Sequence, residues 1–119
     1  MSGLGWIGVD LDGTLAAWDG TWRGPRHIGE PVPAMVDRVR GWIDAGHEVR
    51  IVTARVAPVD VAAADLSAAR EAIQAWCLTH LGKQLPITAT KDFRMLALYD
   101  DRCVRVEINT GRLLSEEGL

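Results

Sequence analysis

Five short apolar runs punctuate the chain, and longer amphipathic or glycine-rich stretches separate them. Runs of this length that end in polar or glycine-containing turns are typical of strands in a buried sheet. We expect strands over residues 6–11, 48–53, 85–89, 95–99 and 103–108.

Two of the intervening stretches have the three- and four-residue apolar spacing of a helix. The first covers 33–45, begins on a proline and has Gly46 just beyond its end. The second covers 61–81, with Asp60 as a candidate N-terminal cap and Gly82 as its stop. These residue types favour the starts and ends of helices.

Strands separated by helices predict a parallel sheet with helices packed on its faces. The expected fold class is α/β: a three-layer, Rossmann-like domain with a mostly parallel central sheet of about five strands. A chain of 119 residues predicts one domain, 1–119, and no stretch is long enough for a cap domain. Residues 12–32 are rich in glycine and proline, so we expect a loop or flap over the site, with a small hairpin near residues 19–20.

Composition narrows the class of protein. Apolar residues are 48% and charged residues 24%, as in globular domains. No apolar run is long enough to cross a membrane, and no signal-peptide pattern is present. Cys77 and Cys103 cannot build a disulfide framework and are expected to be buried thiols. We expect a cytoplasmic protein without a membrane partner. The net charge of −3 leaves nucleic acid possible as a partner but unsupported.

Residues capable of phosphate and metal chemistry follow the predicted strands. Asp10 and Asp12 end the first strand, Thr53 the second and the Asp100-Asp101 pair the fourth, while Lys91 follows the third. Ligands of open parallel sheets bind at the carboxyl ends of the strands. A carboxylate cluster needs a cation, and hard oxygen ligands suit Mg²⁺, the expected cofactor. With an ammonium and a hydroxyl added, this edge predicts a site for a phosphate dianion.

An Asp-x-Asp-Gly segment also occurs in calcium-binding loops. The EF-hand pattern requires an acidic or amide residue at the fifth loop position and a glutamate at the twelfth. Those positions hold Thr14 and Thr21, which disfavours a calcium loop.

The order of these residues resembles the haloacid dehalogenase superfamily. Its four motifs are matched by Asp-Leu-Asp-Gly-Thr-Leu at 10–15, Ile-Val-Thr-Ala-Arg at 51–55, Lys91 and Tyr-Asp-Asp-Arg at 99–102. The resemblance spans about residues 5–106 and is specific for the superfamily, not for a substrate. The chain also looks similar to small capless hydrolase-like proteins of phages and bacteria. More distantly, it resembles the phosphatase half of phage polynucleotide kinase/phosphatases.

The resemblance implies a Mg²⁺-dependent phosphomonoester hydrolase that forms an aspartyl-phosphate. Asp10 would be the catalytic nucleophile, and Asp12 would protonate the leaving oxygen and then activate water. Mg²⁺ would bind Asp10, the backbone carbonyl of Asp12 and Asp100, with Asp101 as a further ligand or as a hydrogen-bond partner. Which member of the Asp100-Asp101 pair touches the metal stays open.

The resemblance also assigns the phosphate-binding groups. Thr53 and the amide of Ala54 would bind the phosphoryl oxygens. Lys91, both catalytic and phosphate-binding, would neutralise charge on Asp10 and on the phosphate.

Three further residues are candidates for binding the rest of the substrate. Arg55 is suited to a substrate anion, and the alternative explanation is a salt bridge at the surface or at the sheet edge. Trp18 and Trp22 either pack the 12–32 loop onto the domain or form a rim on which a base or ring stacks.

Two functions remain open on these observations. The first is a phosphatase whose phosphorylated substrate is a nucleotide or a macromolecular phosphate end, which a site without a cap would admit. The alternative is a catalytically weak module on the same fold that binds phosphate, a nucleotide or a partner. Either a monomer or a homodimer is compatible with the sequence.

Overall fold

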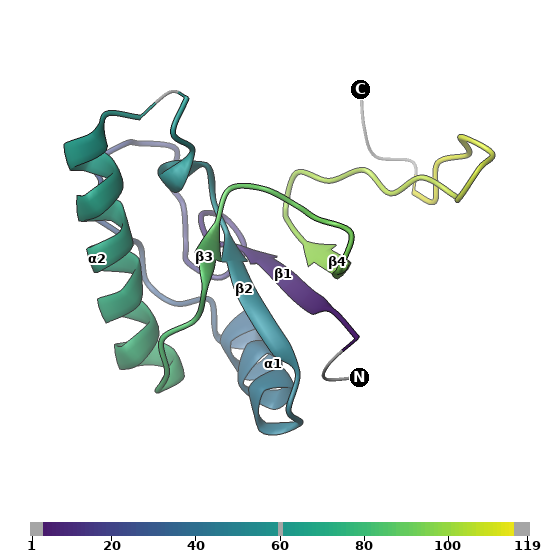
Figure 1. Ribbon diagram of the computed structural model, residues 1–119, viewed down its shortest axis with the longest axis horizontal. Helices are drawn as coiled ribbons and strands as arrows, with labels where there is room; N and C mark the ends of the chain where they lie inside the picture. The colour runs from purple at the N-terminus through teal and green to yellow at the C-terminus, as the bar shows by residue number, and fades with distance from the viewer. Residues whose placement is uncertain (1–3, 60, 116–119) are drawn as a thin grey trace.

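The computed structural model describes residues 4–59 and 61–115, which form an α/β fold (Figure 1). In chain order the elements are β1 (Trp6–Asp10), α1 (Pro33–Asp44), β2 (Glu48–Val52), the short 3-10 helix η1 (Ala54–Val56), α2 (Ala63–Leu81), β3 (Ile87–Thr88) and β4 (Met95–Tyr99). Both predicted helices and the first four predicted strands are confirmed, with β3 shorter than expected.

The four strands form one sheet in the order β3-β2-β1-β4, and every neighbouring pair is parallel. β1 is central: Asp10 is in register with Val52 of β2, and Val9 with Tyr99 of β4. The residues that follow β1, β2 and β4 therefore meet at one edge of the sheet, as the sequence predicted.

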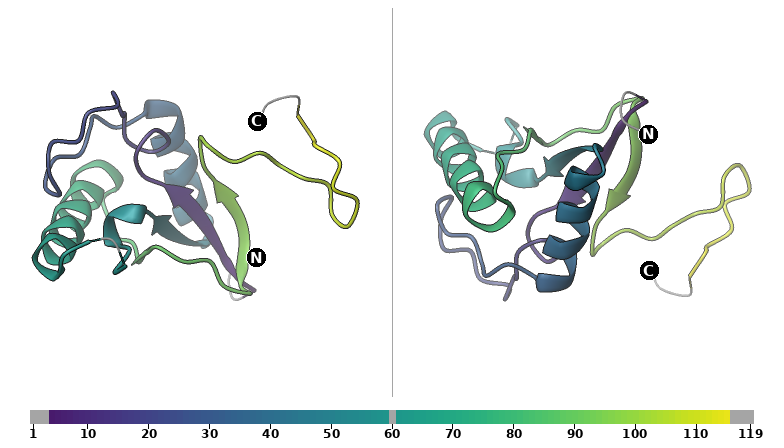
Figure 2. Two further views of the ribbon diagram at one scale, coloured as in Figure 1. Left: turned by 90° about the horizontal axis from the view of Figure 1, so that it is seen from above. Right: turned by 90° about the horizontal axis from the view of Figure 1, so that it is seen from below.

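Both helices cover the same face of the sheet (Figure 2). Val39 of α1 and Ile73 of α2 join Val9 and Ile51 of the sheet in one apolar cluster. The two crossovers run in the same direction along the sheet, and right-handed crossovers then place their helices on the same side. Within the described residues the segment between β3 and β4 contains no helix. The fold is therefore two-layered there, and the expected third layer is not found.

The opposite face of the sheet is covered by polar side chains, and neither helix of the described residues lies on it. Trp6 is fully buried there, with the Cζ of Arg50 4.6 Å from its ring centroid. The Trp6 indole N–H donates to Oδ1 of Asp92 at 2.9 Å. The Arg50 guanidinium covers the Trp6 ring, and Asp92 accepts the hydrogen bond of its indole N–H. The tryptophan can therefore be buried on this face without a helix packed over it.

The prediction of a fifth strand over 103–108 is wrong. This segment is extended and mostly exposed, and its one bridge is antiparallel, between Val106 and Leu113. Its alternating pattern suits a strand, but no strand of the sheet lies beside it. Cys103 is consequently exposed rather than buried. Cys77 is buried in α2 as expected, and burial raises the pKa of its thiol to about 11.

The helix ends follow the predicted chemistry where they are described. α1 begins on Pro33, and Gly82 follows α2 with a φ of 75°, a left-handed conformation that glycine adopts readily. The predicted cap, Asp60, lies outside the described residues. In the described part of the chain, neither helix combines the length and apolar character needed to cross a membrane.

The 12–32 loop is closed at its base by the backbone. The amide of Ala17 donates to the carbonyl of Glu30 at 2.7 Å, and that of Val32 to the carbonyl of Leu15 at 2.8 Å. Gly20 lies in a bend, and the hairpin expected near residues 19–20 is not formed. The loop therefore leaves and rejoins the body at one narrow point, beside the end of β1.

Candidate functional site

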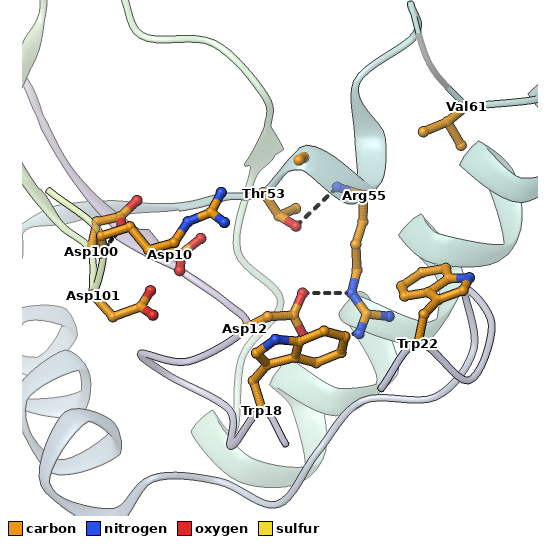
Figure 3. Close-up of a pocket in the computed structure, with 11 residues that line it drawn as sticks. Asp10, Asp12, Trp18, Trp22, Thr53, Arg55, Val61, Asp100 and Asp101 are labelled. Atoms are coloured by element: carbon orange, nitrogen blue, oxygen red, sulfur yellow. Dashed lines mark hydrogen bonds and ion pairs between the residues drawn. The ribbon is translucent and has the colours of Figure 1, made fainter. Parts of the chain in front are cut away.

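A pocket of about 370 Å³ lies at the carboxyl ends of β1 and β2 and beside the end of β4 (Figure 3). It brings together most of the predicted site residues: Asp10, Asp12, Trp18, Trp22, Thr53, Ala54, Arg55, Asp100 and Asp101. Val61 and Arg102 also line it. Residues up to about ninety positions apart in the chain meet here because β4 returns to the central strand.

Three carboxylates converge on one side of the pocket. Asp10, Asp100 and Asp101 each offer an oxygen, and these atoms lie within 4.8 Å of one another. Asp10 comes from the end of β1, and the other two directly follow the adjacent β4. Burial, then repulsion from Asp100, then a hydrogen bond with Asp101 raise the pKa of Asp10 from 3.8 to about 7. A cation placed among the oxygens would remove this cost, so the cluster has the charge and donor type of a metal site.

Thr14 connects the first and last segments of the site. Its hydroxyl lies 3.4 Å from Oδ2 of Asp10 and 3.3 Å from Oδ1 of Asp101, and its oxygen accepts from the amide of Asp101 at 3.0 Å. Thr14 belongs to the Asp-Leu-Asp-Gly-Thr-Leu motif, but its sequence position predicts no role for it. Its place two residues after Asp12 is the one sequence feature that puts it near the site. Its contact with Asp101 could not be predicted, because that contact depends on the tertiary structure.

Gly13 allows these two segments to approach each other. Its φ is +89°, and a Cβ atom built on it would lie 2.6 Å from Oδ2 of Asp101. Both the backbone conformation and the space exclude a larger residue. A glycine is therefore needed at this position of the Asp-x-Asp-Gly segment because the Asp101 carboxylate occupies the space that a side chain would fill.

Asp12 points away from the carboxylate cluster, toward Arg55 (Figure 3). Nε of Arg55 donates to Oδ2 of Asp12 and Nη2 donates to Oδ1, both at 2.8 Å. The Arg55 side chain is only 5% exposed and that of Asp12 is 24% exposed. Arg55 therefore forms a salt bridge, one of its two predicted roles, but the arginine is buried rather than at the surface or the sheet edge.

Arg55 also holds the 12–32 loop against the body. Its Nη1 donates to the carbonyl of His27 at 2.8 Å and to that of Pro25 at 3.3 Å. Its Cζ lies 4.8 Å from the ring centroid of Trp22. Within the described residues this one buried cation meets a carboxylate, two carbonyls and an aromatic ring, so it links the loop to Asp12.

Thr53 and Ala54 form the floor of the pocket where β2 ends. Thr53 is buried, and its hydroxyl oxygen accepts from the amide of Arg55 at 3.2 Å. That contact makes Thr53 the N-terminal cap of η1 and leaves its hydroxyl proton free to donate. The turn thus presents a hydroxyl beside Ala54, as the phosphate-binding prediction requires.

Trp18 and Trp22 stand at the pocket rim and are half exposed, at 44% and 56%. Both come from the 12–32 loop and line the pocket, and Trp22 also packs against the guanidinium of Arg55. Lys91 differs from the other predicted residues: its side chain is exposed and does not line the pocket. Arg102 lines the pocket as a second cationic residue, in addition to Arg55, which is paired with Asp12.

Comparison of the chain with protein-family models, with curated proteins and with solved structures finds no significant match. The function of the chain is therefore inferred from its residues and their geometry.

Proposed function

We propose that the chain is a Mg²⁺-dependent phosphomonoester hydrolase that works through an aspartyl-phosphate intermediate. The observation that carries the proposal is the convergence of the Asp10, Asp100 and Asp101 carboxylates at the same sheet edge as Thr53. A metal-binding cluster next to a hydroxyl and a backbone turn suits a phosphoryl group, whose transfer depends on positioning and charge neutralisation.

The residues present fit a magnesium ion. Their donors are carboxylate oxygens, and the pKa of Asp10 is raised to about 7 by burial and by its acidic neighbours. Asp10, Asp100 and Asp101 would hold the ion by their side chains, and the Asp12 carboxylate lies outside this cluster. When bound, Mg²⁺ would supply positive charge that balances the carboxylates and the phosphoryl oxygens.

Asp10 supplies the nucleophile in the proposed reaction. One of its carboxylate oxygens attacks phosphorus, the bond from phosphorus to the leaving oxygen breaks, and Asp12 gives that oxygen a proton. Water then attacks the phosphorus of the aspartyl-phosphate while Asp12 takes the proton back, which releases phosphate and restores Asp10. Since both oxygens of Asp12 accept from Arg55, each turnover requires one of these two contacts to open.

Thr53, Ala54 and Arg102 would hold the phosphate. The Thr53 hydroxyl donates to a phosphoryl oxygen, and the amide of Ala54 donates to another. Arg102, which also lines the pocket, would supply positive charge. Lys91 would join them only if the segment between β3 and β4 moves toward the pocket.

The rim favours a substrate with an aromatic ring. Trp18 and Trp22 are exposed enough to stack on a base, and no cap closes the pocket in the described residues. A nucleotide or the phosphorylated end of a larger molecule meets both conditions.

Phosphate release from p-nitrophenyl phosphate and from a panel of nucleoside monophosphates tests the proposal. We expect turnover with Mg²⁺, none with EDTA, and loss of turnover in Asp10→Asn. The matched control is Asp44→Asn, which changes an acid at the end of α1, away from the pocket. Turnover that survives EDTA, or that persists in Asp10→Asn, would contradict the proposal.

A second candidate function is supported by the contact between Asp12 and Arg55. A carboxylate with both oxygens occupied by a buried guanidinium is poorly placed to exchange protons with substrate. The chain would then bind a nucleotide or phosphate with Mg²⁺ and turn it over negligibly. Calorimetry that shows tight nucleotide binding, together with no phosphate release over hours, would select this function.

A further inference from the structure

A C-terminal arm, residues 103–115, leaves the body directly after the site. In Figures 1 and 2 it extends away from the sheet and both helices, with no element of the body beside it. Its apolar side chains are exposed: Val104 by 38%, Val106 by 51% and Ile108 by 82%. Because these side chains stay in contact with water, the conformation of the arm is stabilised little by the burial of apolar surface.

In the part of the chain that the structure describes, the contacts that support the arm come from the arm itself. Within the described residues, its backbone hydrogen bonds run from Glu107 to the Arg112 carbonyl at 2.8 Å and from Leu114 to the Arg105 carbonyl at 2.9 Å, with a turn between them. A two-stranded hairpin of this size is marginal in water. The stable placement of the arm therefore requires a surface outside its own hairpin.

The outer edge of β4 is a surface with which an apolar strand such as the arm could pair. β4 is the last strand of the sheet and pairs only with β1 among the described residues. Its sequence, Met-Leu-Ala-Leu-Tyr, has no charge and no proline, the two features that usually block an edge. Leu96 is 47% exposed and Tyr99 40% exposed. The edge presents unpaired backbone groups beside apolar side chains.

The arm cannot reach this edge in its own molecule without dismantling the site. Pairing with its own β4 requires the chain to reverse within residues 100–102. There the amide of Asp101 is held by Thr14 at 3.0 Å, and the amide of Arg102 by Oδ1 of Asp100 at 2.7 Å. These contacts direct the chain outward and keep the two carboxylates at the metal cluster. The edge of another copy carries no such restriction.

We infer that the arm of one copy adds as a strand to the free edge of β4 in a second copy, and that the exchange is reciprocal. Val104, Val106 and Ile108 then lie on one side of the added strand, where their exposed surface is covered by the partner. An interface with twofold symmetry uses the same surface on both subunits, as this one does. The arm and the edge, residues 103–115 and 95–99, supply about 18 residues from each copy, close to the lower end of a standard stable interface of about 20–30 residues a side. This exchange of arms does not depend on the proposed catalytic function.

The oligomeric state of the full chain tests it, by light scattering after size-exclusion chromatography. We expect the wild-type protein to have twice the monomer mass. Val106→Glu on the arm and Leu96→Lys on the edge should each have the monomer mass, with unchanged circular dichroism. Leu78→Glu is the control, because Leu78 is 50% exposed on α2 and should leave the dimer intact.

Hydrogen exchange locates the contact independently. Amides of residues 95–99 should exchange more slowly in the wild-type protein than in Val106→Glu at the same concentration. Three results would overturn the inference: a wild-type monomer at the highest soluble concentration, a dimer that survives both charged substitutions, or equal exchange of the β4 amides in the two proteins.

Discussion

The carboxylate of Asp12 and the guanidinium of Arg55 meet through two parallel N–H···O contacts, both at 2.8 Å. The same guanidinium holds the carbonyls of His27 and Pro25. One side chain therefore sets both the direction of Asp12 and the position of the 12–32 loop, which carries the tryptophan rim.

Replacement of Arg55 should affect stability and turnover together. Arg55→Ala leaves a partly buried carboxylate and two carbonyls unpaired, so we expect the free energy of unfolding to fall by about 2 kcal/mol. Misplacement of Asp12 should lower kcat by up to about 100-fold. Arg55→Lys should recover little, because an ammonium cannot bond both oxygens in one plane.

Urea unfolding and phosphate release measure the two effects. Arg23→Ala is the control: it removes an exposed arginine that pairs with Asp19 in the same loop, and it should leave stability and turnover unchanged. A rise in turnover in Arg55→Ala would contradict the positioning role and would mean that Arg55 restrains Asp12.

The raised pKa of Asp10 predicts how the metal-free protein responds to pH. The folded state holds the proton of Asp10 up to about pH 7, whereas the unfolded chain releases it near 3.8. Stability from this group is therefore complete below pH 3.8 and decreases as the pH rises toward 7. Mg²⁺ binds the deprotonated form, so its binding should release protons and strengthen over the same range.

Thermal unfolding with EDTA and with Mg²⁺, between pH 5 and pH 8, checks this dependence. The stabilisation by Mg²⁺ should grow with pH in the wild-type protein. In Asp10→Asn the metal-free protein should lose less stability over this range. An equal effect of Mg²⁺ at both ends of the range would contradict the assignment of Asp10 as a ligand.

Gly13→Ala should disturb the cluster formed by Asp10, Asp100 and Asp101. The new Cβ would lie 2.6 Å from Oδ2 of Asp101 and would require a φ of +89°, so the carboxylate must move. Gly46→Ala imposes a similar conformation, φ +87°, with no atom within 4 Å. Both should lose about 1 kcal/mol of stability through the backbone. Only Gly13→Ala should also lose Mg²⁺ affinity, measured by calorimetry, and equal affinity in the two variants would exclude the steric role.

The tryptophan rim predicts a preference among substrates. Stacking of a base on an aromatic side chain contributes about 1–3 kcal/mol, so Trp18→Ala or Trp22→Ala should raise KM for a nucleoside monophosphate about tenfold. KM for glycerol phosphate, which has no ring, should not change. Phe93→Ala removes a fully exposed aromatic that does not line the pocket and serves as the control. An equal change for both substrates would assign the tryptophans to packing of the loop.

Arg102 and Lys91 compete for the role of the phosphate-neutralising cation. Arg102 lines the pocket and Lys91 does not, so Arg102→Ala should lower kcat/KM more than Lys91→Ala. Steady-state kinetics of both variants decides between them. A larger loss in Lys91→Ala would restore the role that the superfamily resemblance assigns to Lys91 and would require the segment after β3 to move on binding.

The sequence predicted the parts of the site that lie at strand ends. Asp10, Thr53 and Asp100 each stand at the end of a short apolar run, and parallel strands bring such residues to one edge without further information. Lys91 follows a strand of two residues, and its chain position does not determine how far the connecting segment extends. The pairing of Asp12 with Arg55 realises one of two alternatives that the sequence left open for the arginine.

Other features depend on contacts that no local pattern contains. The alternation over 103–108 shows that the segment can form a strand, but not that a neighbour exists. The role of Gly13 comes from Asp101, far along the chain. A third layer would need a helix between β3 and β4, and the described residues there contain none. A count of apolar runs in the sequence does not reveal that this helix is missing.

The narrow base of the 12–32 loop allows the loop to be lengthened without changing the rest of the fold. The Ala17 to Glu30 and Val32 to Leu15 hydrogen bonds bring the two ends of the loop together before it reaches the pocket. Each doubling of the length of a flexible loop costs only about 0.6 kcal/mol in closure entropy. Residues between these bonds can therefore be exchanged for a longer segment, even a folded insert, while the sheet and its carboxylates keep their places. The loop is therefore a site where an insertion can change the substrate selectivity of the fold, provided that the inserted segment supplies two backbone carbonyls to Arg55.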